Sequence, residues 1–206
     1  QEVSYSDLGK HIRKAASVFQ NIGLHAGDRI ILSAHKDVEY VYLYFAAHIL
    51  GVTNVIVDAE SNEERLHFIE NKIRPACCFG YRSSDFPSKL FNELDLNNAD
   101  EMPESTANPV SSDIAEILFT TGTTGDPKGV CLSYNNIYSS ASNINGYIGT
   151  QADDVELLGL PICHSFGMGR IRCTLMKGAT IVILGNFANV RTFLKAFEQY
   201  HITGFG

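Results

Sequence analysis

Residues 120–129 read Thr-Thr-Gly-Thr-Thr-Gly-Asp-Pro-Lys-Gly and directly follow the mostly apolar run Ile-Ala-Glu-Ile-Leu-Phe at residues 114–119. The three glycines carry no Cβ atom, so successive backbone N–H groups can approach one anion closely. The four threonine hydroxyls add short donors, and Lys128 adds a mobile positive charge suited to phosphate. We interpret the stretch as a cradle for a polyphosphate; a polar turn between two strands is the alternative.

This loop differs from the common nucleotide-binding loops. Lys128 lies between Pro127 and Gly129, and the next residues, 130–132, have the apolar character of a strand. A Walker A loop would instead open a helix whose N-terminus faces the phosphates. The Gly-x-Gly-x-x-Gly fingerprint of dinucleotide sites follows none of the expected strands. The pattern therefore predicts a strand–loop–strand phosphate site.

Residues 119–136 resemble the signature loop of the adenylate-forming, or AMP-binding, superfamily. Tyr134 is a departure, because many members carry histidine there. A second stretch, Leu-Pro-Ile-Cys-His-Ser-Phe-Gly at residues 160–167, resembles the next core motif of the superfamily in the form typical of acyl-CoA synthetases. Weaker matches extend the resemblance to nearly the whole chain, at residues 4–8, 27–29, 50–51 and 64–66.

The resemblance implies an AMP-forming acid–thiol ligase that makes an acyl adenylate from a carboxylic acid and ATP, then an acyl-CoA thioester. ATP, Mg²⁺ and CoA are the implied cofactors and cosubstrate, and fatty acid metabolism is the implied setting. His164 is implied to line the acyl pocket near the reacting carboxylate; a local hydrogen-bonding role at a strand–helix junction is the alternative. The implied phosphate-binding residues are Thr120, Thr121, Gly122, Thr123, Thr124, Gly125 and Lys128.

Composition restricts the class of protein. The chain has 206 residues, of which 45% are hydrophobic and 19% charged, as in ordinary globular proteins. The net charge of −7 argues against nucleic-acid binding. Apolar runs all fall short of the ~20 residues that cross a bilayer. These features fit a cytoplasmic enzyme, and the resemblance implies that its partner is a small-molecule carboxylic acid.

Several side chains are predicted to have structural roles. The five cysteines form no Cys-x-x-Cys pair, so we expect buried free thiols in a reducing compartment. Arg170 and Arg172 are expected on a solvated helix face. We predict no metal ligands, because metal-ligand spacing is absent from histidines 11, 25, 35, 48, 67 and 201.

Alternating periodicities predict an α/β fold of mostly parallel sheets flanked by helices. Ser61 and Glu64 are expected to form a capping box. Helices are expected near residues 8–22, 38–49, 61–73, 89–94, 135–147, 168–176 and 190–200. Strands are expected near residues 29–33, 54–57, 76–79, 114–119, 130–132, 155–160 and 179–184.

The resemblance also suggests how the chain is organised. Residues 1–82 are expected to form βα units, residues 83–112 a surface connection, and residues 113–206 the signature loop and a second α/β part. Together they would be the partial amino-terminal domain of an acyl-CoA synthetase-like fold. We expect the carboxy-terminal domain to be absent, the 206 residues alone to be inactive, and truncated surfaces to favour self-association. An adenylation domain that loads a carrier protein and a noncatalytic nucleotide-binding module are the alternatives.

Overall fold

The computed structural model describes residues 2–103, 109–120, 126–184 and 189–205. The chain forms two compact units, residues 1–134 and 135–206, which we call the first and second unit. Each unit is an α/β structure, as the sequence predicts.

The first unit is built on a six-stranded sheet in the order β4-β3-β1-β2-β5-β6. All neighbouring strands are parallel except β5 and β6, which form an antiparallel hairpin. The strands are β1 (Arg29–Ala34), β2 (Thr53–Asp58), β3 (Cys77–Phe79), β4 (Ser88–Lys89), β5 (Ile114–Phe119) and β6 (Gly129–Ser133). The two strands that flank the Thr/Gly loop are thus part of the first sheet.

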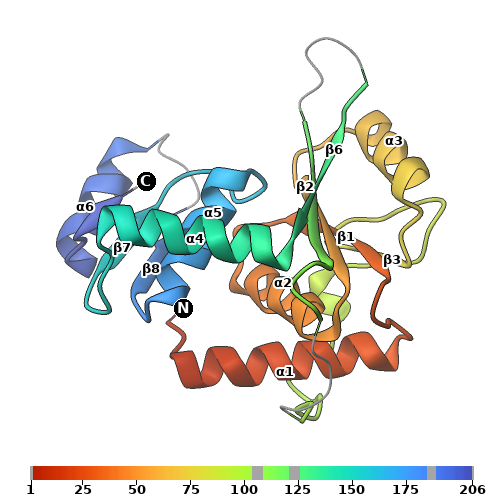
Figure 1. Cartoon of the computed structure of the whole chain (residues 1–206), viewed down its shortest axis with the longest axis horizontal. Helices are drawn as coiled ribbons and strands as arrows, with labels where there is room; N and C mark the ends of the chain where they lie inside the picture. The colour runs from red at the N-terminus through yellow and green to blue at the C-terminus, as the bar shows by residue number, and fades with distance from the viewer. Residues whose placement is uncertain (1, 104–108, 121–125, 185–188, 206) are drawn as a thin grey trace. The chain divides into compact units, whose positions relative to one another are not determined.

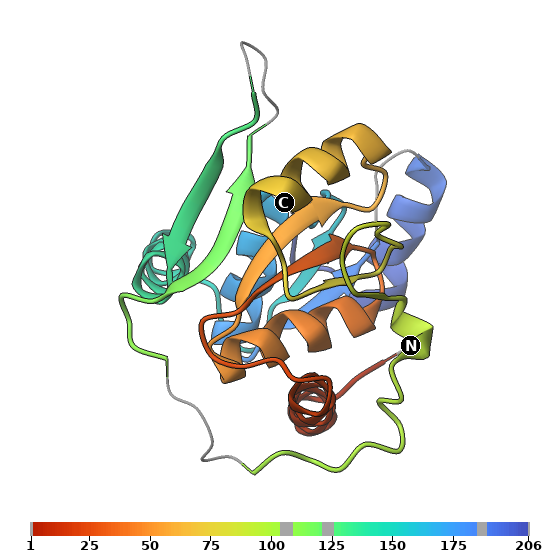
Figure 2. The ribbon, with the colours of Figure 1, turned by 90° about the vertical axis from the view of Figure 1, so that its right-hand side faces the viewer.

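Helices cover both faces of this sheet (Figures 1 and 2). The helix α2 (Val38–Leu50) lies between the sheet and α1 (Tyr5–Asn21) and is buried on nearly all sides, which explains its almost unbroken apolar sequence. The helix α3 (Glu63–Ile73) covers the opposite face, where Ile69 and Ile73 join a core with residues of four strands. A buried Glu116 interrupts the apolar run of β5 and accepts a 2.9 Å hydrogen bond from the Tyr44 hydroxyl.

The second unit has a three-stranded parallel sheet in the order β8-β7-β9. Its strands are β7 (Val155–Leu158), β8 (Thr180–Ile183) and β9 (Gly204–Phe205), the last of which the sequence does not predict. The helices are α4 (Tyr134–Ile148), which begins at the boundary of the units, α5 (Ser165–Met176) and α6 (Val190–Tyr200). Asn145 on α4 donates a 2.9 Å hydrogen bond to the Cys173 carbonyl on α5 and fastens these helices together.

Local signals fix most boundaries, and two predictions there are wrong. The cap of α3 is Asn62 rather than Ser61, because the helix begins at Glu63 and the Asn62 side chain accepts from the Arg65 amide at 2.9 Å. The helix expected at residues 89–94 is a single 3₁₀ turn, η1 (Phe91–Glu93), preceded by β4, whose backbone pairs with β3.

The cysteines are free but not uniformly buried. Cys77, Cys78 and Cys173 are buried, as expected for small apolar side chains. Cys131 is exposed on β6 and Cys163 is half-buried, so the expectation of burial is wrong for Cys131. Among the described residues, no helix combines the length and apolar character needed to cross a membrane.

Candidate functional site

The hairpin of β5 and β6 carries the Thr/Gly loop beyond the carboxyl end of β5. Pairing runs from Ile117 opposite Cys131 to Phe119 opposite Gly129. At the mouth of the loop the Thr120 amide donates to the Lys128 carbonyl at 2.9 Å, and the Lys128 amide donates to Thr120 Oγ1 at 3.1 Å. The two strands predicted on either side of the loop are therefore present and paired (Figure 1). Because β5 is parallel to β2, Thr120 lies at the carboxyl edge of the sheet, where ligands of open α/β sheets bind.

The described part of the loop exposes two of the predicted phosphate ligands. The side chains of Thr120 and Lys128 both face solvent at its mouth. The other five predicted ligands, Thr121, Gly122, Thr123, Thr124 and Gly125, lie outside the described residues and stay predictions.

Arg65 on α3 adds a second positive charge at this position. Its Nη2 donates to the Thr120 carbonyl at 3.3 Å and lies 3.5 Å from the Phe119 carbonyl. The guanidinium therefore fastens the end of β5 to the start of α3. Arg65 was not among the site residues predicted from the sequence. Its place at the loop follows from the order of the strands, because α3 follows β2 and β2 pairs with β5.

Gly129 lies in close contact with two side chains of β5. A Cβ atom built on it would lie 3.1 Å from Ile117 Cγ2 and 3.2 Å from Phe119 Cζ. A larger residue at this position would require these two side chains of β5 to shift by a few tenths of an ångström. All three glycines were expected to allow close approach of an anion; at Gly129 the structure adds tight packing against β5.

The described mouth of the loop carries the cations of Lys128 and Arg65, the Thr120 hydroxyl and the exposed carboxylate of Asp126. The two cations and the hydroxyl are groups that suit a phosphate. Thr120 and Lys128 therefore stay candidate phosphate ligands.

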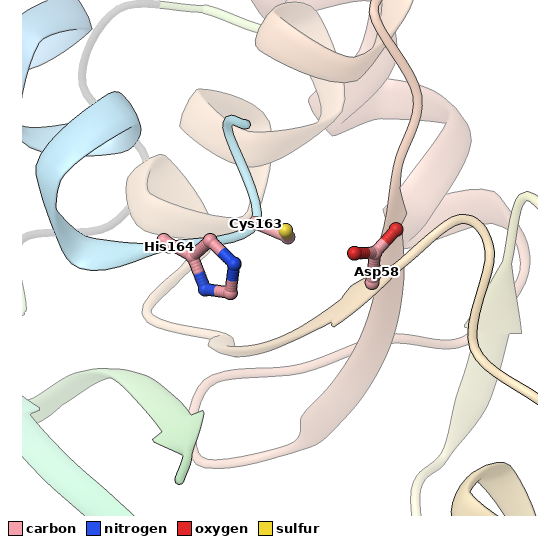
Figure 3. A group of neighbouring side chains, drawn as sticks. All are labelled: Asp58, Cys163 and His164. Atoms are coloured by element: carbon pink, nitrogen blue, oxygen red, sulfur yellow. The ribbon is translucent and has the colours of Figure 1, made fainter. Parts of the chain in front are cut away.

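His164 caps the amino-terminal end of α5 in the second unit. It follows the carboxyl end of β7, has an extended backbone (φ −102°, ψ 154°) and exposes its side chain. Its carbonyl accepts from the Met168 amide at 3.1 Å, in the first turn of the helix. Figure 3 shows Cys163 and His164 in the turn before α5 and, in the first unit, Asp58 at the end of β2. An exposed imidazole at a strand–helix junction can meet a ligand directly.

Gly167 lets this turn fold onto the helix. A Cβ atom there would lie 2.3 Å from the Pro161 carbonyl oxygen, which is part of the backbone and cannot move aside alone. We expect Gly167→Ala to destabilise the second unit by about 1–3 kcal/mol or more, as overpacking does. Urea unfolding followed by circular dichroism measures this loss.

Gly169→Ala is the matched control for this prediction. It adds the same methyl group one half-turn further along α5, where the nearest atom, Arg172 Nη2, is 4.0 Å away. We expect this change to be neutral or stabilising by up to ~1 kcal/mol, because alanine favours helix more than glycine does. Equal stability of the two variants would contradict the steric role of Gly167.

Arg170 is buried in an ion pair, so its prediction as a solvated residue is wrong. Its Nε donates to Glu156 Oε1 at 2.5 Å, and its Nη2 also pairs with Glu156 Oε2. The two side chains are only 11% and 6% exposed. Hydrogen bonding to Glu156 raises the pKa of Arg170 further and keeps the guanidinium charged. The arginine therefore links α5 to β7 and is not available to an acidic substrate.

A pocket of about 760 Å³ in the first unit lies at the other end of the strands. Its walls include the first residues of three parallel strands, Arg29, Thr53 and Ile114. Since these are amino-terminal ends, the pocket is on the opposite edge from Thr120 and Lys128. We do not assign the nucleotide to it.

Known proteins resemble the whole chain. The sequence model of a family described as AMP-binding enzyme matches residues 1–206. The 4-coumarate–CoA ligase 1 of Petroselinum crispum is 27% identical over 97% of this chain and 41% of its own length. The 2-succinylbenzoate–CoA ligase of Bacillus subtilis (strain 168) is 26% identical over 98% of this chain and 43% of its own length. The chain thus spans about two-fifths of the length of these relatives.

The fold is shared with solved structures. An O-succinylbenzoate coenzyme A synthetase from Bacillus subtilis, in complex with AMP, matches 100% of this chain and 55% of its own with a TM-score of 0.91 at 23% identity. The apo structure of a Rhodopseudomonas palustris protein matches 96% of this chain and 43% of its own with a TM-score of 0.88. At this identity the likeness concerns the fold alone.

Proposed function

Because this chain belongs to the AMP-binding enzyme family, we propose that the protein is an ATP-dependent acid–CoA ligase. In this reaction the substrate carboxylate attacks the α-phosphorus of ATP, which releases pyrophosphate and forms an acyl adenylate. The thiol of CoA then attacks the acyl carbon, which releases AMP and a proton and forms the thioester. The observation that carries the proposal is the mouth of the loop at the carboxyl edge of the sheet. There the Arg65 guanidinium donates to the Thr120 carbonyl, and the Lys128 amide donates to the Thr120 hydroxyl.

The residues of the loop would act by binding and neutralising charge. Lys128 and the hydroxyls of the four threonines at positions 120, 121, 123 and 124 would hold the β- and γ-phosphates, which become the leaving pyrophosphate. Arg65 would position the loop, since it donates to backbone carbonyls at the loop's base. Positioning and electrostatic stabilisation of this kind supply most of the rate in phosphoryl chemistry. Mg²⁺ would neutralise part of the phosphate charge, and we assign no described residue to it.

His164 would bind the carboxylic acid substrate. Its exposed imidazole at the end of β7 can donate a hydrogen bond to a carboxylate.

We place the protein in the cytoplasm, because all five cysteines are free thiols. The relatives named above are ligases of 4-coumarate and 2-succinylbenzoate, which are aromatic acids. We therefore favour aromatic acids over fatty acids as substrates.

Acid-dependent exchange of radiolabelled pyrophosphate into ATP tests the proposal. The protein expressed from its own gene is incubated with ATP, Mg²⁺ and a panel of aromatic and fatty acids. We expect exchange with at least one acid, and acyl-CoA when CoA is added. Adenylation without transfer to CoA would instead favour a domain that loads a carrier protein. Nucleotide binding without exchange for any acid would favour a noncatalytic module.

Replacing His164 by alanine should lower acid-dependent exchange about 10- to 100-fold, as expected when a hydrogen bond to a charged group is lost. ATP affinity, measured by calorimetry, should stay unchanged, because we assign the phosphates to the Thr/Gly loop and not to His164. Ser165→Ala, at the exposed next position, is the control and should retain activity. A parallel loss of ATP affinity and melting temperature in His164→Ala would indicate a folding defect and contradict the assigned role.

A further inference from the structure

Three side chains with metal-binding atoms converge on the α3 face of the first unit. His67 Nδ1 lies 3.6 Å from Glu70 Oε2 and 3.2 Å from Asp85 Oδ2. All three ligand atoms lie within 4.8 Å of one another. The side chains of His67 and Asp85 are about half exposed, whereas that of Glu70 is only 2% exposed. The group therefore has one buried and one open side.

The fold brings these residues together from two segments. His67 and Glu70 are three positions apart on α3 and so share one helix face. Asp85 belongs to the connection between β3 and β4, where Ser83 Oγ accepts from the amides of Asp85 and Phe86 at 3.2 and 3.1 Å. Because Phe86 packs on the core beneath α3, the connection is fastened on both sides of Asp85.

Glu70 is held in one orientation by neutral donors. The Tyr81 hydroxyl donates to Glu70 Oε1 at 2.9 Å, and the Cys78 thiol lies 3.8 Å from the same atom. These two groups orient the carboxylate, whose Oε2 atom lies 3.6 Å from His67 Nδ1. A buried carboxylate needs a positive partner at this position.

We propose that His67, Glu70 and Asp85 bind a divalent transition-metal ion, with Zn²⁺ as the preferred ion. Tetrahedral bonds of about 2.0–2.1 Å separate ligand atoms by about 3.3 Å. The two distances measured from His67 Nδ1, 3.2 and 3.6 Å, lie on either side of that value. Imidazole with carboxylates suits Zn²⁺ better than Mg²⁺ or Ca²⁺, which favour oxygen ligands alone. The exposed side leaves the fourth position to water.

The bound ion would join the β3–β4 connection to α3. Arg65, two residues before His67 on the same helix, holds the base of the Thr/Gly loop. The ion would therefore stabilise the helix on which the loop rests. This proposal is independent of the proposed ligase function, because the site lies outside the residues assigned to ATP and the acid. Sequence spacing predicted no metal ligand at His67, since Asp85 is close to it only after folding.

Calorimetric titration of the chelator-treated protein with Zn²⁺ tests the site. We expect one ion per chain, with affinity lowered at least about 100-fold in both His67→Ala and Asp85→Asn, because removal of a direct ligand should cost no less than loss of an orienting group. His25→Ala and Asp153→Asn remove an exposed histidine and an exposed aspartate elsewhere, and should bind as the parent does. Cys131→Ser should also retain binding, which excludes the exposed thiol as the ligand.

Tyr81→Phe separates an oriented site from a chance cluster. We expect it to weaken Zn²⁺ about 10- to 100-fold, since groups that orient a ligand contribute that much. Co²⁺ used as a probe should give visible absorption typical of four-coordinate geometry in the parent and not in Asp85→Asn. Melting curves without metal establish that each variant is folded. Undetectable binding to the folded parent, or equal binding by the parent and both ligand variants, would overturn the proposal.

Discussion

Replacing Thr123 and Thr124 together by valine should lower acid-dependent ATP–pyrophosphate exchange at least tenfold. Valine keeps the shape of threonine but lacks its hydroxyl, so two donors to a charged phosphate are lost. Each such hydrogen bond contributes about 1.5–3 kcal/mol. The hydrogen bonds that close the hairpin run between Thr120 and Lys128 and are untouched by the change. The effect should therefore fall on ATP turnover rather than on folding.

Val130→Thr is the control for this double variant. It makes the reverse exchange of a methyl group and a hydroxyl at an exposed position of β6, where Val130 is 47% exposed. We expect its exchange rate to equal that of the parent. If the double valine variant also exchanged at the parental rate, the loop would not bind the phosphates, and the polar-turn interpretation would hold.

Features fixed by near neighbours in sequence were predictable. Gly51 ends α2 in a left-handed conformation (φ 70°), a position that favours glycine, and the sequence places the helix end there. The last helix, α6, has the predicted bounds Val190–Tyr200, because its apolar residues recur at helical spacing and Asn189 caps it. The wrong cap of α3 is a local error of one residue, between the two adjacent polar side chains Ser61 and Asn62.

Features fixed by packing between distant segments were not predictable. Arg65 reaches the loop because β2 and β5 are neighbours in the sheet, and the order of strands is not encoded in periodicity. Gly129 is tightly packed because Ile117 and Phe119 lie across the hairpin. The grouping of His67 with Asp85 depends on the path of the β3–β4 connection over α3. In each case the sequence shows which residue is present, but it does not show which distant residue that side chain contacts.

Arg170→Met should destabilise the second unit by about 3–5 kcal/mol, because it leaves the Glu156 carboxylate buried without its cation. Arg170 occupies both carboxylate oxygens of Glu156, and the remaining partner, Thr174 Oγ1 at 3.1 Å, is a neutral donor. Hydrogen exchange of amides in β7 and α5 measures the loss locally, which matters because two compact units can open separately.

The double variant Glu156→Leu/Arg170→Met distinguishes the cost of an unpaired charge from the loss of packing. Apolar residues of similar size often replace a buried ion pair at little cost, so the second substitution should restore most of the protection lost in the first. Lys177→Met removes an exposed cation just after α5 and should leave protection unchanged. If Arg170→Met reduced amide protection no more than Lys177→Met does, the Arg170–Glu156 pair would behave as a solvated ion pair. The sequence-based expectation that Arg170 lies on a solvated helix face would then be correct. If the double variant stayed as unstable as Arg170→Met, the arginine would act through packing of its side chain rather than through its charge.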